Sequence, residues 1–521
     1  MKGIFIVPLL FLHVICLAQT QNAVGIFENH QDIGNPKLKG SASYDAATQA
    51  YTITGAGSNI WFNRDEFQFV YKKLGGNFIL TADFAFAGDT GNAVGHRKIG
   101  WMIRESTDEG AASMNACKHI DGLTVLQWRP YHGMYMRDPE EELFYPKQGG
   151  QTVQLERNGN KVTMRMAHPG EPLQTVGTAE IDLKDSVLVG LYICSHDSDH
   201  TASAKVWNVR IDKPIIHPYT SNPHVVTPPL KDELGSRLEI MTLADGMRKV
   251  IYEGKGRFEA PNWMPDGKSL LFNEKGSLYT ISVNGGTPQK LNTGDAATIN
   301  NDHGISFDGK MLAISNSRAG LYGGGSSVYV LALAGGTPKL LTQGTPSYWH
   351  GWNPNGKEVA FVAQRDSSKI YNIYKQAING GVEVALTHNT KGHVDGPEYS
   401  PDGKYIYYNA NPTGTMQVWR MKPDGSGKEQ LTFDEYHNWF PHISPDGKWI
   451  CFISFPIEID PASHPSYERV MLRLMPANGG APKVIAYLYG GQGTLNVNSW
   501  SPDSKSIAFV SNSEKPDKAP Q

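Results

Sequence analysis

The pattern of apolar and polar positions along the first 213 residues is that of short β-strands. Apolar residues alternate with polar ones in segments such as 77–86, 161–166 and 204–211, and Gly, Asn and Asp separate these segments. No helical period is visible, and alternation with a period of two is typical of half-buried strands. We therefore expect residues 21–213 to form an antiparallel β-sandwich of the jelly-roll kind.

The second half of the chain is organised by a repeat. A hydrophobic residue followed, in the fullest copies, by Ser-Pro-Asp-Gly-Lys and an apolar run begins six times, at residues 263, 305, 352, 399, 443 and 500. Pro presets the first turn position, Asp accepts hydrogen bonds within the turn and Gly supplies a positive φ, so each copy predicts a hairpin turn. We expect these aspartates to be structural. A period of about 40 to 50 residues is typical of β-propeller blades.

The two ends of the repeat region predict the number of blades. The last copy leaves room for only two strands before residue 511, whereas residues 237–251 have the pattern of two further strands. Pairing of both ends in one blade would close the ring and leave no open sheet edge. The sequence thus predicts an all-β protein, in which the sandwich is followed by a six-bladed β-propeller at residues 233–511 and a tail at 512–521.

The first 18 residues have the pattern of an export signal. Met1 and Lys2 precede an apolar run that ends at residue 18, and the run contains Pro8 and His13. It is shorter than the roughly 20 apolar residues of a membrane-spanning helix. We expect a cleaved signal peptide (1–18), no transmembrane segment after cleavage and a periplasmic or secreted protein. A membrane anchor is the alternative.

Composition narrows the range of partners. The 521 residues carry 48 Lys and Arg against 51 Asp and Glu, a net charge of −3, so the chain has no basic field for nucleic acid. Four cysteines do not make a disulfide framework, although one Cys117–Cys194 bridge is compatible with an oxidising compartment. Five prolines between residues 214 and 229 predict a stiff linker over 214–232, between two domains.

The repeat resembles that of TolB-type β-propellers over residues 233–511. The match is clearest at residues 399–404 (Tyr-Ser-Pro-Asp-Gly-Lys) and 443–448 (Ile-Ser-Pro-Asp-Gly-Lys). Similar repeats occur in oligogalacturonate lyases and in relatives of prolyl oligopeptidase. The chain has no Gly-x-Ser-x-Gly nucleophile elbow, which argues against a peptidase.

The first half resembles concanavalin-like lectin and glucanase sandwich domains. The resemblance rests on segments 100–105, 189–196 and 208–211. Aromatic rings stack on sugars, and charged groups bind sugar hydroxyls, so this domain offers a candidate sugar platform. Its members are Trp61, Trp101, Trp128, Tyr131 and Tyr135, with Arg104, Glu105 and His132. The alternative is that most of these rings fill the core.

Alignment of the repeats predicts which side chains face the central channel of the propeller. The strand before each turn is the innermost of its blade, and every second residue on it can point to the channel. The predicted catalytic residues are Arg257, His303 and His350, the substrate-binding residues Glu259, Tyr348, Trp439 and Asn498, and the metal ligands His303, His350, His393, His437 and Asp395.

Imidazoles and carboxylates in this number suit a divalent metal ion of unknown identity, with an open coordination position. Such an ion would polarise a uronate carboxylate or activate water, while Arg257 would bind an anionic group. The resemblance to oligogalacturonate lyases, whose metal is held largely by His, likewise implies a metal ion held by histidines in the channel. The alternative is that each His bonds to backbone at a blade entrance and is architectural.

Two functional hypotheses follow. In the first, an exported glycan-directed protein binds carbohydrate with its sandwich, and the propeller funnel binds or cleaves an oligosaccharide. If it is an enzyme, we expect a metal-assisted polysaccharide lyase or glycoside hydrolase. In the second, a non-catalytic TolB-like scaffold binds another envelope protein. An insertion at residues 455–467 either shapes the binding face or is a tolerated surface loop.

Overall fold

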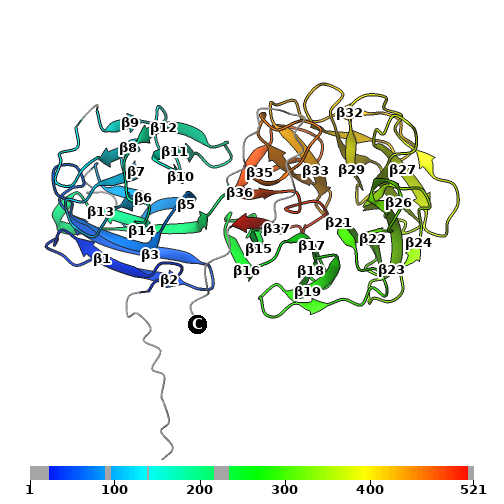
Figure 1. Ribbon diagram of the computed structural model, residues 1–521, viewed down its shortest axis with the longest axis horizontal. Coiled ribbons are helices and arrows are strands. Elements are labelled where there is room, and N and C mark those ends of the chain that lie inside the picture. The colour runs from blue at the N-terminus through cyan, green and yellow to red at the C-terminus, as the bar shows by residue number, and fades with distance from the viewer. Residues whose placement is uncertain (1–22, 89–94, 138–139, 216–233, 514–521) are drawn as a thin grey trace, which may run out of the picture.

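The computed structural model describes residues 23–88, 95–137, 140–215 and 234–513. They form two β domains that lie side by side (Figure 1). The predicted signal peptide and most of the predicted linker and tail lie outside the described residues. Within those residues no helix is long and apolar enough to cross a membrane. The helical element η1 (Tyr322–Gly325) is a single short 3-10 turn.

The first domain consists of two seven-stranded antiparallel sheets. The order in one sheet is β1 (Asn29–Ile33), β4 (Phe67–Leu74), β13 (Val187–Cys194), β6 (Lys98–Arg104), β7 (Ser113–His119), β8 (Thr124–Arg129) and β9 (Glu142–Phe144). The order in the other is β12 (Gln174–Glu180), β11 (Lys161–Ala167), β10 (Thr152–Asn158), β5 (Phe78–Ala87), β14 (Asp197–Asp212), β3 (Ala50–Gly57) and β2 (Ser41–Asp45). Apolar side chains of both sheets, among them Ile53, Trp101 and Leu155, share one core.

The second domain is the predicted six-bladed propeller. Five blades have four strands each, from the innermost to the outermost. They are β17 (Phe258–Trp263), β18 (Ser269–Glu274), β19 (Ser277–Ser282) and β20 (Gln289–Lys290); β21 (Ile299–Ile305), β22 (Met311–Ser317), β23 (Ser326–Ala332) and β24 (Lys339–Leu340); β25 (Ser347–Trp352), β26 (Glu358–Ala363), β27 (Asn372–Ala377) and β28 (Val384–Ala385); β29 (Val394–Tyr399), β30 (Ile406–Ala410), β31 (Gln417–Met421) and β32 (Glu429–Gln430); β33 (His437–Ile443), β34 (Trp449–Phe455), β35 (Ser466–Pro476) and β36 (Lys483–Gly491).

The sixth blade closes the ring as the sequence predicts. Strand β37 (Ser506–Ser513) pairs with β15 (Gly235–Thr242), which pairs in turn with β16 (Arg248–Gly254). The innermost part of this blade is reduced to a bridge between Trp500 and Ile507. Both ends of the repeat region therefore meet in one sheet, which leaves the ring without a free edge at the joint.

The repeated turns hold the blades in the way that their residues predict. In the fourth blade, Ser400 Oγ and the Lys404 N–H both donate to Asp402 Oδ1, at 2.7 and 3.1 Å. Gly403 has a φ of 68°, a conformation that a side chain would oppose. Asp402 thus serves the hairpin, and the structural role expected for the aspartate of the repeat is confirmed in this blade.

A buried ion-pair cluster fastens the two domains to each other. Arg210 of β14 donates to Oε2 of Glu239 on β15 at 2.6 Å, and Arg248 of β16 donates to both oxygens of Glu239, at 3.0 and 3.1 Å. The three side chains are at most 8% exposed. A bulge in β14 turns Asn208 toward the propeller, where it accepts from the Arg248 N–H and donates to the carbonyl of Gly246. The domains are therefore joined by direct packing.

The three cysteines within the described residues are free. Cys117 lies on β7 and Cys194 on β13, and β6 runs between these two strands. The bridge that the sequence allowed is therefore not formed. Burial raises the pKa of the Cys117 thiol to about 12 and that of Cys194 to about 11, so both are unreactive structural thiols.

Candidate functional site

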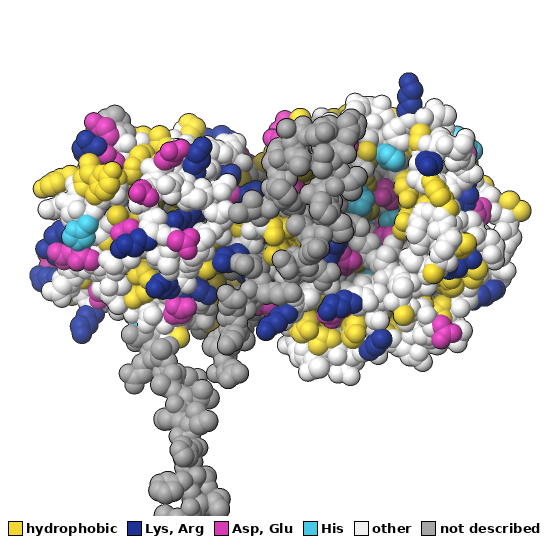
Figure 2. Space-filling view, viewed as in Figure 1, with side chains coloured by type: hydrophobic (Ala, Val, Ile, Leu, Met, Phe, Trp, Pro, Cys, Tyr) yellow, Lys and Arg dark blue, Asp and Glu magenta, His cyan; other side chains and the backbone are white. Residues whose placement is uncertain are grey.

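A polar cavity of about 600 Å³ lies at one mouth of the propeller channel. Figure 2 shows the hollow on this face, with histidine and acidic side chains around it. Its amide side chains are Asn273, Asn300, Asn301, Gln492 and Asn496. Its ionisable side chains are Arg257, Glu259, Lys275, Asp302, Tyr348, His350, Tyr371, Asp395 and His464.

Most charges in the cavity are arranged in pairs. Arg257 and Glu259, two residues apart at the start of the first blade, form an ion pair. His350 Nε2 of the third blade lies 2.9 Å from Asp395 Oδ1 of the fourth. His464 Nε2 lies 3.9 Å from the other oxygen of Asp395. One carboxylate thus sits between two imidazoles from different blades.

The protonation of this group is set by burial and by the pairing. Burial raises the pKa of Asp302 to about 7, a rise that His350 opposes and Asp395 supports. Burial would lower the pKa of His350, but Asp395 outweighs it and the pKa is raised. In the same way burial would raise the pKa of Asp395, but His350 lowers it. The cavity therefore holds a fixed ion pair beside a carboxyl that exchanges its proton near neutral pH.

Five of the residues predicted to form a site line this cavity: Arg257, Glu259, Tyr348, His350 and Asp395. Four of them form two ion pairs: Arg257 with Glu259, and His350 with Asp395. The repeat alignment therefore locates the mouth of the channel correctly. The other predicted residues, His303, His393, His437, Trp439 and Asn498, are not among the lining residues.

The predicted histidines outside the cavity have other surroundings. His303 is fully buried, and neither of its ring nitrogens has a hydrogen-bond partner among the described residues. Burial lowers its pKa to about 4. His437 Nδ1 accepts from the Met416 N–H at 3.4 Å, which is the architectural role that was the alternative. The His393 ring packs beside Tyr371.

Trp439 and Asn498 also make contacts outside the cavity. Trp439 is buried in the core of the fifth blade, with its ring 4.4 Å from that of His464. Asn498 donates to Glu398 Oε1 at 2.7 Å and to the carbonyl of Ile443 at 2.9 Å. The substrate-binding role predicted for these two residues therefore has no support from their positions.

A bulge in the inner strands explains why simple alternation fails. The pairing register shifts between Asp395 and Glu398 in β29 and between Ile299 and His303 in β21. One extra residue, as in β29, reverses the faces of the residues that follow it, whereas the shift in β21 spans two extra residues. Asp395, before the shift in β29, lines the cavity as predicted, whereas His303, at the end of the irregular segment of β21, is buried.

Two important residues of the cavity were missed by the alignment. Asp302 precedes His303 and has the parity that strict alternation excludes. His464 comes from the insertion at 455–467, outside the repeat, and reaches the cavity beside Trp439. The only signal in the sequence for His464 was the length of that insertion.

The predicted metal ligands do not converge. Within the part of the chain that the structure describes, no three of them bring their ligand atoms within 4.8 Å of one another. The group that meets this criterion, His96, His119 and Asp121, lies in the first domain.

The predicted sugar platform is divided between core and surface. Trp101 and Arg104 are fully buried, and Arg104 pairs with Asp65. Tyr131 and Tyr135 are 69% and 55% exposed. The exposed ring of Phe62, which the sequence did not single out, lies 6.1 Å from that of Tyr135.

A six-bladed ring with Ser-Pro-Asp-Gly turns, closed between its first and last strands, is the fold that the resemblance to TolB-type propellers implied. A family model described as TolB beta propeller domain matches residues 324–458. The uncharacterized protein Atu1656 of Agrobacterium fabrum (strain C58) is 45% identical over 276 residues, which are 53% of this chain and 92% of that protein. The chain therefore belongs to the family of TolB-type β-propeller proteins.

Further matches agree with this assignment. A solved structure, "The structure of putative TolB from Agrobacterium tumefaciens", is 44% identical, with a TM-score of 0.51, over 54% of this chain and 99% of that one. The Tol-Pal system protein TolB of Francisella tularensis (strain WY96-3418) is 25% identical over 219 residues, 40% of this chain and 49% of that protein. The chain thus spans about half the length of this TolB relative.

Proposed function

We propose that the protein is an exported, TolB-like binding protein whose propeller cavity holds a peptide segment of another envelope protein. The observation that carries this proposal is the lining of the cavity. Five amide side chains line it. Hydrogen bonds within the chain fix Asn273, Asn300 and Asn496 in place, so the amide of Asn301 and the Nε2 of Gln492 are the groups that we expect to meet a ligand. A polypeptide backbone presents the complementary groups at every residue.

The internal charge pairs favour the same kind of ligand. Because Arg257 is paired with Glu259 and His350 with Asp395, a ligand does not have to bring a charge to compensate either pair. A free cationic cluster would instead favour a polyanion such as a uronate chain. The leader pattern of the sequence supports a partner in the periplasm or outside the cell.

Cleavage of an oligosaccharide with a metal ion has less support. That hypothesis needs several of the predicted imidazoles at one point, and His303, His393 and His437 lie away from the cavity lining. The titratable carboxyl of Asp302 is the feature that a catalytic site would use as a general acid or base.

Peptides selected by display against the full chain are expected to bind in the cavity. Replacement of Tyr348 or Gln492 by Ala should weaken them about tenfold or more, equivalent to about 1.4 kcal/mol, in calorimetric titrations. Lys339→Ala, on the outermost strand β24, is the matched control and should leave the affinity unchanged. Equal affinity of all variants, or displacement of the peptides by oligogalacturonates, would contradict the proposal.

A second function is favoured by the exposed rings of the first domain. We infer that this domain is a concanavalin-like sandwich that binds a glycan through Phe62, Tyr131 and Tyr135. Beside the rings, His132 Nε2 lies 2.7 Å from Asp108 Oδ1, so polar groups for sugar hydroxyls are present at the same place. Rings with polar neighbours are typical of sugar-binding surfaces.

On a glycan array the full chain is expected to give signals that depend on these rings. Tyr131→Ala and Tyr135→Ala should each reduce the affinity for the best glycan about tenfold or more. Phe144→Ala removes a ring that is 49% exposed elsewhere on the same domain and should have no effect. A silent array, or equal loss with Phe144→Ala, would remove the basis for this second function.

A further inference from the structure

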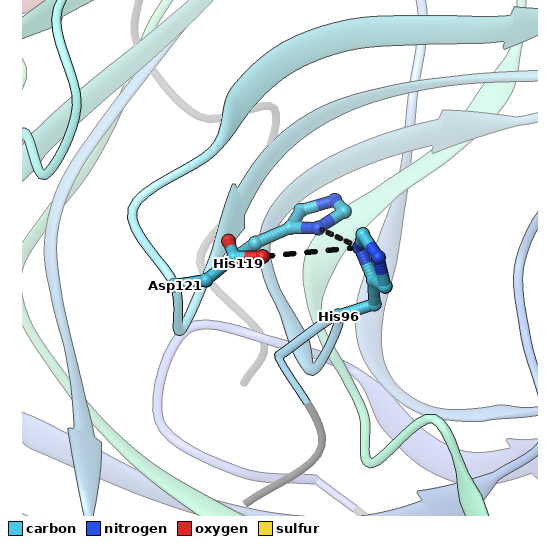
Figure 3. Close-up of side chains that lie close together, drawn as sticks. All are labelled: His96, His119 and Asp121. Atoms are coloured by element: carbon cyan, nitrogen blue, oxygen red, sulfur yellow. Dashed lines mark hydrogen bonds and ion pairs between the residues drawn. The ribbon is translucent and has the colours of Figure 1, made fainter.

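Two histidines and an aspartate meet at one end of a sheet in the first domain (Figure 3). His96 precedes β6, His119 is the last residue of β7 and Asp121 lies in the turn that follows. β6 and β7 are neighbouring strands, and Lys98 pairs with His119 in their register. The sheet therefore brings the three side chains together from two chain segments.

The ligand atoms of the three side chains lie within 4.8 Å of one another, and one pair has the separation of two ligands on the same metal ion. His96 Nδ1 lies 3.3 Å from His119 Nδ1 and 4.0 Å from Asp121 Oδ2. Zinc bonds of about 2.0 to 2.1 Å in tetrahedral geometry place two ligand atoms about 3.3 Å apart. The two imidazole nitrogens already have this separation, and Asp121 is within one small side-chain adjustment of it.

The His119 ring lacks the partners that a buried polar group normally has. It is 3% exposed, and its Nε2 has no hydrogen-bond partner among the described residues. Its contact with His96 joins two nitrogens at 3.3 Å. The Nε2 is not the atom that faces His96. An ion bound between the two Nδ1 atoms would replace their mutual contact.

The backbone around the cluster holds the ligands in place. The Asp121 N–H donates to the carbonyl of Gly95, and the Ile120 N–H donates to that of Arg97. Asp121 Oδ1 accepts from the Leu123 N–H at 3.0 Å, which leaves Oδ2 directed to His96. Fixing one carboxylate oxygen to orient the other is a common feature around metal ligands.

Solvent has access to the cluster from one side. The side chains of His96 and Asp121 are 57% and 39% exposed, whereas His119 closes the inner side. The nearby cation, Lys98, donates to Asn59 Oδ1 and to the carbonyl of Ile60. The His196 ring lies beside that of His96, with centroids 5.5 Å apart.

We propose that His96 Nδ1, His119 Nδ1 and Asp121 Oδ2 form a binding site for a divalent transition-metal ion, with Zn²⁺ as the best fit. Two imidazoles and one carboxylate match the ligands of zinc sites that keep a position open. The open position faces solvent, where water or an anionic group of a ligand completes the coordination. The site is separate from the propeller cavity and does not depend on the function proposed for it.

The test is a calorimetric titration of Zn²⁺ into the chelator-treated full chain without an affinity tag. The wild-type chain is expected to bind one ion per chain at this site. His96→Ala and Asp121→Asn change exposed side chains, so they should fold normally, and each should weaken binding at least about tenfold. With Co²⁺ in place of Zn²⁺, the visible absorption of a tetrahedral ion should disappear in His96→Ala.

Two controls separate this site from other histidines. His200→Ala removes an exposed imidazole that lies 2.7 Å from Asp197 in the same domain, and His350→Ala removes one from the propeller. Both should leave the Zn²⁺ affinity and stoichiometry unchanged. The proposal is overturned if the wild-type chain binds no Zn²⁺, or if His96→Ala and Asp121→Asn bind it as tightly as the wild type.

Discussion

Replacement of Glu239 by Gln is expected to destabilise the protein by about 3 to 5 kcal/mol and to separate the unfolding of its two domains. The carboxylate lies between Arg210 and Arg248, with side-chain exposures of 8% and 4% for the two arginines. Without its charge, the two buried guanidinium groups lose the carboxylate that both of them contact, and Asp212 remains as a more distant anion for Arg248. Burial would raise the pKa of Glu239, but the two arginines hold it well below its usual range.

Differential scanning calorimetry checks this prediction, since wild-type domains fastened by the cluster should unfold together. Glu239→Gln should lower the transition temperature and resolve a second transition. Glu253→Gln is the matched control, because Glu253 pairs with Arg237 but is 52% exposed. Glu253→Gln should lower the free energy of unfolding by less than about 1 kcal/mol. An unchanged transition in Glu239→Gln would show that the cluster contributes little to the interface.

Replacement of Asp302 by Asn is expected to stabilise the propeller, and to do so more at about pH 8 than at about pH 4. The carboxyl has a pKa of about 7 in the folded chain, compared with about 3.9 in an unfolded one. The folded state therefore holds the proton over a range in which the unfolded state has released it. Stability falls as the pH rises from about 4 to about 7. Three pKa units correspond to an upper bound of about 4 kcal/mol.

Urea unfolding at the two pH values measures the effect. The gain from Asp302→Asn should be small at the lower pH and approach a few kcal/mol at the higher one. Asp308→Asn, in the turn of the same blade, is the control with the opposite sign. Its pKa is lowered by the hydrogen bond from Ser306. A gain for Asp302→Asn that does not change with pH would show that the carboxyl titrates normally.

The stability that the protein loses by keeping the Asp302 carboxyl buried indicates that this group has a functional role. Buried groups with strongly shifted pKa values gather at binding and catalytic sites, where stability is often sacrificed. Asp302 faces the cavity beside the His350–Asp395 pair. Uptake or release of its proton would couple the affinity for a peptide to the pH of the compartment.

The fold was predictable because its determinants are local and repeated. The turn at Asp402 depends on residues that are adjacent in the chain, and six copies make the period visible. The closure by β15 and β37 followed from a count of missing strands. In the first domain, alternation predicted strands, but the assignment of single rings to core or surface depends on which strands become neighbours. In the sequence, Trp101 and Tyr131 look equally suitable for stacking on a sugar. In the structure, Trp101 is buried in the core and Tyr131 is exposed.

Regular alternation predicted only part of the site, because the pairing of the inner strands is irregular. Glu259 and Asp395 precede the shift in their strands and line the cavity as expected. His303 follows it and is buried. His464 comes from an insertion that no repeat alignment covers. His96 and His119 meet through strand pairing across 23 residues, which is invisible to a search for short ligand motifs.

The closure of the propeller also limits the order in which the molecule can assemble during folding. Strand β15 has to wait for β37, which is made more than 260 residues later. During that time the first domain is already complete, and its Gln49 can take both hydrogen bonds that it makes with Val250. Next to these bonds, Arg210 can hold Glu239. The earlier domain can thus hold the β15–β16 pair in place while the other edge of β15 stays open for the last strand, β37.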